Sequence, residues 1–314
     1  MKNIYSIIIS CFVALTTFAQ QYGNYYNSVQ ANDSGLVLKN KLTQIITNTH
    51  SNSLSYTPGV WNTLKVSDLD LEETNKVVLV YGYDNASSDV RFHRTRLASN
   101  NGGSNGQWNR EHVYPRSKGV PDLGDSGPGS DAHHLRPADV QFNGYRSNRP
   151  FNNNTGNARV NSDGTWYPGD EWKGDVARMM MYMYLRYGER CLPSRVGPDT
   201  VSISQIDEMI DLFIQWHLED PVSPFEIQRN QGVADRQGNR NPFIDVPDFV
   251  NRVWIPGNYT GGDNPTSSVN TLNVASFNMS PNPTSGYVVI QSTNVDSYQY
   301  TITDALGRQI GEGN

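Results

Sequence analysis

A short stretch of this chain gathers side chains that can carry out acid–base and metal chemistry. The carboxylate of Glu111 is followed directly by the imidazole of His112. Residues 131–137 then add two histidines and an arginine, and residues 143–148 add two asparagines and another arginine. Carboxylates, imidazoles, amides and guanidinium groups in one region are the set that metal-assisted hydrolysis of a phosphodiester requires.

Each of these groups has a specific use in that reaction. A phosphodiester is anionic and a poor electrophile, so its hydrolysis needs a base for the water, a cation near the leaving oxygen and donors that hold the phosphate. His112 suits the base because an unperturbed imidazole titrates near neutral pH. Glu111 is a hard oxygen ligand of the kind that Mg²⁺ binds together with several waters. Adjacent side chains on a strand point to opposite faces, so we expect Glu111 and His112 to meet at the end of an element.

The sequence resembles the endonuclease I family of secreted bacterial nucleases, whose active site is a ββα-metal (His-Me) finger. The resemblance spans most of residues 36–254. It is carried by an ordered set of blocks at residues 111–113 (EHV), 133–137 (HHLRP), 143–148 (NGYRSN), 173–178 (KGDVAR) and 237–245 (QGNRNPFID).

This resemblance implies a role for several residues. His112 becomes the general base on the first strand of the finger. Glu111 and Asn143 become the metal ligands, with Asn143 on the helix that follows the second strand. The implied cation is Mg²⁺, with Mn²⁺ and Ca²⁺ as alternatives. The implied activity is hydrolysis of DNA, and also of RNA as an open second substrate, with little sequence preference and with 5′-phosphate and 3′-hydroxyl ends as products.

The phosphate contacts follow from charge and location. We expect Arg136, on or beside the second strand, to hold the scissile or leaving phosphate as part of the catalytic set. A planar guanidinium binds phosphate oxygens in pairs, so we assign further nucleic-acid contacts to Arg110, Arg116, Arg146 and Arg149. His133, His134 and Asn148 are expected to support the site. The chain departs from well-known family members, which are rich in disulfides and carry an arginine between the Glu-His pair and the second strand; here residues 116–130 hold only Arg116 and Lys118 as basic residues.

Two other functions are compatible with parts of the sequence. A zinc hydrolase that uses His133 and His134 is disfavoured because adjacent histidines on a strand diverge, whereas helical zinc pairs stand about four residues apart. An exported binding or adhesion module without catalysis would share the terminal segments described below. Such a module has no need of the ordered blocks, so they favour the nuclease.

Net charge and cysteine content restrict the possible partners and metal sites. The 314 residues carry a net charge of −6, which alone does not indicate a nucleic-acid partner. Between residues 85 and 160, however, basic side chains outnumber acidic ones, which favours a locally positive groove. The two cysteines are Cys11, in a segment that we expect to be removed, and Cys191. The mature chain is therefore expected to have no intramolecular disulfide and no metal site built on cysteine.

The ends of the chain indicate export. Residues 1–19 read as a secretory signal peptide, and their apolar run is short for a membrane span, so we expect no stable membrane insertion after cleavage. Residues 22–256 form the expected catalytic domain and 257–272 a linker. Residues 273–314 resemble the first part of a type IX secretion sorting domain, through 280–286 (SPNPTSG) and 304–308 (DALGR). That resemblance implies a truncated β-sandwich, the type IX machinery as a partner, and a secreted or cell-surface location reached through the periplasm.

The expected fold class is α+β, a mostly helical domain around a small sheet. Apolar spacing predicts helices over residues 36–48, 174–187 and 204–218, the last capped by Ser204. A compact β-rich run predicts a buried strand over 76–81. We expect Trp166 and Tyr167 to pack rather than to stack on bases, and residues 237–245 to buttress the site with Asp245 in a structural role. His50, His93 and His217 are also predicted to be structural.

Overall fold

The computed structural model describes residues 24–256, 277–280, 289–292, 300–303 and 309–313. The predicted signal peptide and linker lie outside these ranges. Residues 25–256 belong to a single compact unit that contains all of the predicted site. No helix in the described ranges is long and apolar enough to cross a membrane.

The C-terminal segments form two antiparallel strand pairs. Strand β7 (Phe277–Ser280) pairs with β8 (Val289–Ser292), and β9 (Tyr300–Thr303) pairs with β10 (Gln309–Gly313). The rest of the predicted sorting domain lies outside the described residues. The β-sandwich therefore stays a prediction.

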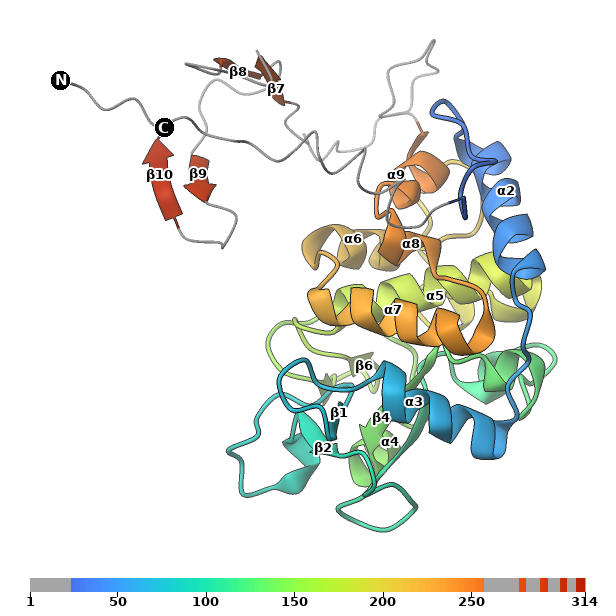
Figure 1. Ribbon diagram of the computed structural model, residues 1–314, viewed down its shortest axis with the longest axis vertical. Coiled ribbons are helices and arrows are strands. Elements are labelled where there is room, and N and C mark those ends of the chain that lie inside the picture. Colours follow the sequence, from blue (N-terminus) through green and yellow to red (C-terminus); the bar gives the residue numbers. More distant parts are fainter. Residues whose placement is uncertain (1–23, 257–276, 281–288, 293–299, 304–308, 314) are drawn as a thin grey trace. The chain divides into compact units, whose positions relative to one another are not determined.

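Helices make up one half of the main unit, as Figure 1 shows. Helix α2 (Gly35–Asn48) confirms the first predicted helix and buries one stripe of side chains. Helix α5 (Lys173–Tyr187) is buried along nearly its whole length, as its continuous apolar sequence predicts. Helix α6 (Asp211–Glu219) packs against it. The remaining helices of this half are α7 (Pro224–Gln237), α8 (Pro242–Asp245) and α9 (Phe249–Trp254).

The other half carries short antiparallel ribbons instead of one small sheet. Strand β1 (Lys76–Val78) pairs with β2 (Thr95–Leu97), β3 (Trp108–His112) with β4 (Leu135–Asp139), and β5 (Arg159–Val160) with β6 (Trp166–Tyr167). Helices α3 (Trp61–Ser67) and α4 (Val140–Arg146) accompany them (Figure 1). Trp166 and Tyr167 are fully buried, which confirms that they pack in the core. The architecture is α+β, as predicted.

The predicted strand over 76–81 ends early, at Val78. The chain turns between Leu79 and Gly82, where the Gly82 N–H donates to the Leu79 carbonyl at 3.2 Å. Tyr81 has a φ of +74° in this turn. The side chains stay buried, so the apolar run correctly indicated core residues but did not reveal the turn.

The predicted helix over 204–218 begins only at Asp211. The Asp211 carboxylate accepts from the backbone N–H groups of Ser202 and Ile203, so it closes the preceding loop. Asp207 accepts from the Trp254 indole at 3.0 Å and also pairs with Lys39. The apolar spacing of residues 204–210 favours a helix, but these contacts with distant residues keep the segment in a non-helical conformation.

Candidate active site

Strands β3 and β4 and helix α4 form a continuous ββα unit. Glu111 on β3 stands opposite Arg136 on β4, and His112 stands opposite Leu135. Helix α4 follows β4 directly because the Asp139 carboxylate caps it, accepting from the N–H groups of the first turn. The predicted order of strand, strand and helix is therefore present. His112 is the last residue of β3, so the Glu-His pair lies at an element boundary, as predicted.

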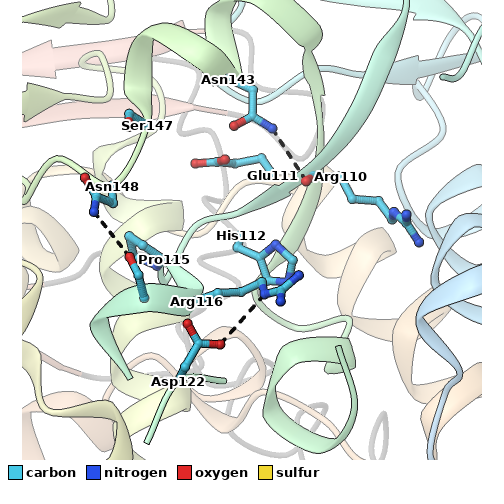
Figure 2. Close-up of a pocket in the computed structure, with 10 residues that line it drawn as sticks. Arg110, Glu111, His112, Pro115, Arg116, Asp122, Asn143, Ser147 and Asn148 are labelled. Atoms are coloured by element: carbon cyan, nitrogen blue, oxygen red, sulfur yellow. Dashed lines mark hydrogen bonds and ion pairs between the residues drawn. The ribbon is translucent and has the colours of Figure 1, made fainter. Parts of the chain in front are cut away.

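The end of β3, the loop after it and one face of α4 enclose a pocket of about 340 Å³. Figure 2 shows the side chains that line it. They are Arg110, Glu111, His112, Pro115, Arg116, Ser117, Asp122, Asn143, Ser147 and Asn148. The structure thus brings together the predicted base, both predicted metal ligands, two of the predicted arginines and the predicted supporting Asn148.

The two predicted metal ligands offer oxygen atoms that the protein leaves unused. Glu111 is 2% exposed, and its Oε1 accepts from the Tyr81 hydroxyl at 3.0 Å and lies 3.4 Å from Arg146 Nε. Within residues 24–256, no hydrogen bond or ion pair involves its Oε2. The Asn143 amide nitrogen donates to Asn109 Oδ1 at 2.8 Å and faces the Arg110 carbonyl at 3.5 Å, so the amide oxygen points away from β3 (Figure 2). Burial raises the pKa of the Glu111 carboxyl to about 7, while Arg146 and the hydrogen bond from Tyr81 act in the opposite direction.

The predicted base is held in one tautomer. His112 Nε2 lies 2.9 Å from the Gly129 carbonyl oxygen, which can only accept, so Nε2 carries the proton and Nδ1 has the free lone pair. Tyr56 stacks on the imidazole with ring centroids 5.6 Å apart. Burial, with help from nearby His134, lowers the pKa of His112 to about 3. The imidazole is therefore neutral at neutral pH, and its Nδ1 lone pair is unprotonated.

Two arginines line the pocket, and Figure 2 shows the side chain of one of them, Arg110, directed away from Glu111 and Asn143. The Arg110 guanidinium lies 3.5 Å from the centre of the Tyr56 ring and 4.2 Å from that of Trp61, and its Nη1 donates to Thr57 Oγ1 at 2.9 Å. This aromatic clamp fixes the guanidinium before any substrate arrives. The Arg116 side chain is 42% exposed, and its ion pair within residues 24–256 is a long one, 4.0 Å to Asp122.

Sequence comparisons identify the family of the chain. A sequence model of the endonuclease I family matches residues 34–248. The chain belongs to the endonuclease I family. It is 39% identical to the extracellular ribonuclease of Bacillus amyloliquefaciens over 252 residues, covering 77% of this chain and 81% of that protein. The extracellular ribonuclease of Bacillus subtilis (strain 168) is also 39% identical, over 241 residues that cover 73% of this chain and 78% of that protein. A periplasmic deoxyribonuclease of Aeromonas hydrophila is 28% identical over 127 residues, which cover 37% of this chain and 47% of that protein.

The chain is therefore an endonuclease, but not every arginine that we predicted for its site lies there. Arg136 has no exposed surface, and its guanidinium pairs with Asp68 at 2.7 Å and Asp175 at 3.1 Å. This burial contradicts the predicted phosphate contact, because a phosphate would have to displace two buried carboxylates. Sequence spacing could not show this, since both partners come from other parts of the chain.

Arg146 and Arg149 also lie apart from the predicted contacts. Arg146 is fully buried, donates to the Val113 carbonyl at 2.8 Å and faces Glu111, so its burial contradicts direct nucleic-acid contact. Arg149 is partly exposed, donates to the Tyr145 carbonyl and does not line the pocket. Of the arginines predicted to contact nucleic acid, Arg110 and Arg116 therefore line the pocket.

Two buried histidines of the endonuclease contact backbone carbonyl groups. His133 Nε2 lies 3.0 Å from the Asn239 carbonyl oxygen, and His134 Nε2 lies 2.8 Å from that of Pro128. Among the residues that the structure describes, no three or more His, Cys, Asp or Glu side chains form a group that could hold a metal. His133 and His134 are therefore not part of such a group within the described residues. His134 instead fixes the carbonyl next to Gly129, the residue whose own carbonyl holds His112.

Residues 237–245 form the predicted buttress under this region. Gln237 donates to Asp131 Oδ1 at 2.8 Å, and its amide oxygen accepts from the Ala132 N–H at 2.9 Å. Asp245 is buried and pairs with Arg240, which confirms its structural role. The segment that precedes β4 is thus bound to a distant part of the chain.

Three buried histidines predict a loss of stability in acid. Burial lowers the pKa of His133 and His134 to about 4 and that of His217, beside Arg178, to about 3. Their ordinary pKa in the unfolded chain is about 6.5, so between about pH 6.5 and pH 4 the unfolded state binds more protons. The free energy of unfolding should therefore fall as the pH drops through this window, by on the order of 2 kcal/mol for each histidine.

Urea unfolding at several pH values between 7 and 4 measures this slope. His217→Gln should make the pH dependence of the free energy of unfolding shallower than in the wild type. Equal slopes in the two proteins would contradict the role assigned to the buried rings.

Proposed function

We propose that this endonuclease is a secreted, metal-dependent enzyme that hydrolyses the phosphodiester bonds of RNA and DNA with little sequence preference. One observation carries the proposal. A single pocket holds an imidazole with one free ring nitrogen, a buried carboxylate with an uncommitted oxygen, and an amide oxygen turned toward the same space.

The donor set fits a hard divalent cation of the Mg²⁺ type. Glu111 Oε2 and the Asn143 amide oxygen would hold it, with water completing its shell, because Mg²⁺ takes one or two protein oxygens and keeps several waters. The contacts of Glu111 support this assignment, since Tyr81 and Arg146 both lie at Oε1 and leave Oε2 for a cation within the described residues. Mn²⁺ and Ca²⁺ are alternatives. When bound, the cation would offset charge on the leaving 3′ oxygen.

The residues of the chain supply the remaining steps. His112 accepts through Nδ1 the proton of a water that attacks phosphorus in line, while the Gly129 carbonyl holds Nε2 and keeps the ring oriented. Arg110 and Arg116 donate to non-bridging phosphate oxygens. These contacts go to the backbone of the nucleic acid and not to its bases, so sequence preference is weak and binding is sensitive to salt.

The comparisons support both the substrate class and the location. The two Bacillus relatives, which match about three quarters of the chain, are named ribonucleases, and the shorter Aeromonas match is named a deoxyribonuclease. RNA is therefore an expected substrate beside DNA. All three names place those proteins outside the cytoplasm, in agreement with the predicted signal peptide. Routing by the type IX machinery through residues 273–314 rests on the sequence resemblance.

Gel assays of the full chain test the proposal on supercoiled plasmid and on ribosomal RNA. We expect cleavage of both substrates with Mg²⁺ and none with EDTA. Because phosphate contacts dominate, raising the salt from about 50 to 200 mM should raise KM at least several-fold. Cleavage that continues at full rate in EDTA would overturn the metal requirement. Folded protein that cleaves neither substrate with any divalent cation would overturn the proposed function.

A further inference from the structure

Two residues with unusual backbone conformations lie close to Glu111. Tyr81, with φ +74°, and Ser147, with φ +53°, are the non-glycine residues of the described chain that have positive φ. Side chains other than glycine rarely adopt this conformation, and it persists only where the surroundings enforce it. Such strain is concentrated at functional sites in proteins. Here both strained residues connect to the same carboxylate oxygen.

Tyr81 reaches Glu111 directly. Its ring is fully buried and packs edge-on against Trp166, with ring centroids 5.2 Å apart, and its hydroxyl donates to Glu111 Oε1 at 3.0 Å. The turn is tight at this point: a Cβ on Gly82 would come within 2.3 Å of the His93 carbonyl oxygen. The backbone therefore places the Tyr81 hydroxyl on Glu111 despite the unfavourable φ.

Ser147 reaches Glu111 through Arg146. It ends helix α4, and its carbonyl accepts from Arg146 Nη1 at 3.1 Å. Arg146 also donates to the Val113 carbonyl at 2.8 Å, and its Nε lies 3.4 Å from Glu111 Oε1. The guanidinium thus joins the end of the helix to the end of β3 and holds a fixed charge beside Oε1.

We propose that Tyr81 and Arg146 are positioning residues that hold Oε1 of Glu111, so that Oε2 alone is offered to the cation, and that this makes the site prefer Mg²⁺ to Ca²⁺. The inference rests on the proposed function, because it assumes that Glu111 binds the metal. Its physical basis is the different demand of the two ions. Mg²⁺ requires a compact octahedral shell, whereas the larger Ca²⁺ takes more oxygens and readily accepts both oxygens of one carboxylate. A carboxylate with one oxygen engaged by the protein therefore disfavours Ca²⁺.

Calorimetric titration of the full chain with Mg²⁺ and with Ca²⁺ tests the proposal without measuring activity. Tyr81→Phe removes one hydroxyl and keeps the ring that fills the core. We expect its Kd for Ca²⁺ to fall about 3- to 10-fold relative to its Kd for Mg²⁺. Tyr182→Phe is the matched control, because its buried hydroxyl also donates to a carboxylate, Asp131 at 2.8 Å, which does not line the pocket. It should leave the ratio of the two Kd values unchanged.

Two more variants separate the possible failures. Arg146→Lys keeps the charge but cannot span the same contacts, so it should shift the ratio in the same direction as Tyr81→Phe. Glu111→Gln should abolish the binding of both ions. If the wild-type chain shows no binding that depends on Glu111, the proposed metal site itself is overturned. If binding depends on Glu111 but neither Tyr81→Phe nor Arg146→Lys shifts the ratio, only the positioning role is overturned.

Discussion

Replacing His112 by alanine is expected to lower the cleavage rate about 100- to 10,000-fold, the range that a positioned general base contributes. The reason lies in the tautomer. The Gly129 carbonyl accepts the Nε2 proton at 2.9 Å, so Nδ1 is the free basic atom of this ring, and no other imidazole lines the pocket in the described part of the chain. The pKa of His112, lowered to about 3, keeps that atom unprotonated at neutral pH.

Binding and catalysis should separate in this variant. Arg110 and Arg116 remain in place, so the affinity for nucleic acid, measured in EDTA by fluorescence anisotropy with a labelled oligonucleotide, should change less than about threefold. His93→Ala is the matched control, because it also removes an imidazole bonded to a carbonyl, that of Ser87 at 2.8 Å, but away from the pocket. Equal losses of affinity and rate in His112→Ala would show that the ring binds the substrate and is not the base.

The centre of the site could be predicted because its residues are close in sequence and their chemistry is distinctive. Glu111 and His112 are adjacent, and Asn143 follows on the next helix, so one local ββα unit carries all three. Local sequence patterns were also sufficient to predict helices α2 and α5, because their apolar residues follow a regular pattern over many residues. In each of these cases the signal lies within one element or between neighbouring elements.

The supporting residues could not be predicted, because they come from distant parts of the chain. Tyr56, which stacks on His112, and Tyr81, which binds Glu111, both precede β3 and belong to no recognisable motif. The strand over 76–81 was predicted too long for the same reason: a tertiary contact, from the Val80 N–H to the Pro137 carbonyl at 2.8 Å, holds the turn. A run of apolar residues indicates that the side chains are buried, but it does not show where the strand ends and the backbone turns.

The arginines illustrate the same limit. Arg110 and Arg136 both lie on the β3–β4 ribbon, and both suit a phosphate by charge alone. What separates them is the set of groups packed around each one. The Arg110 guanidinium is partly exposed and lies against two aromatic rings, whereas that of Arg136 meets the carboxylates of Asp68 and Asp175 in the core. Neither carboxylate is near Arg136 in the sequence, so only the fold assigns the two roles.

Because Arg136 is buried between carboxylates, its replacement should have a large effect on the stability of the fold. Replacing Arg136 by methionine keeps most of the side-chain volume but leaves two buried carboxylates without their shared partner. Removing one member of a buried ion pair typically costs about 3–5 kcal/mol. We expect the lower end of that range, because Asp68 keeps an ion pair with Arg229 at 2.9 Å. Urea unfolding at pH 7 measures the loss, and cleavage per folded molecule should stay within about threefold of wild type.

Arg116→Met should give the opposite result, and the pair of variants tests the assignment more strictly than either alone. The Arg116 side chain is 42% exposed, so its loss should change the free energy of unfolding by less than about 0.5 kcal/mol. It should weaken nucleic-acid binding similarly for all sequences and reduce the slope of log affinity against log salt by about 1. If Arg136→Met instead kept full stability and lost cleavage, the guanidinium would act on the phosphate after all. The buried carboxylates would then have to open toward the pocket when substrate binds, and Asp68→Asn would be expected to change the rate as well.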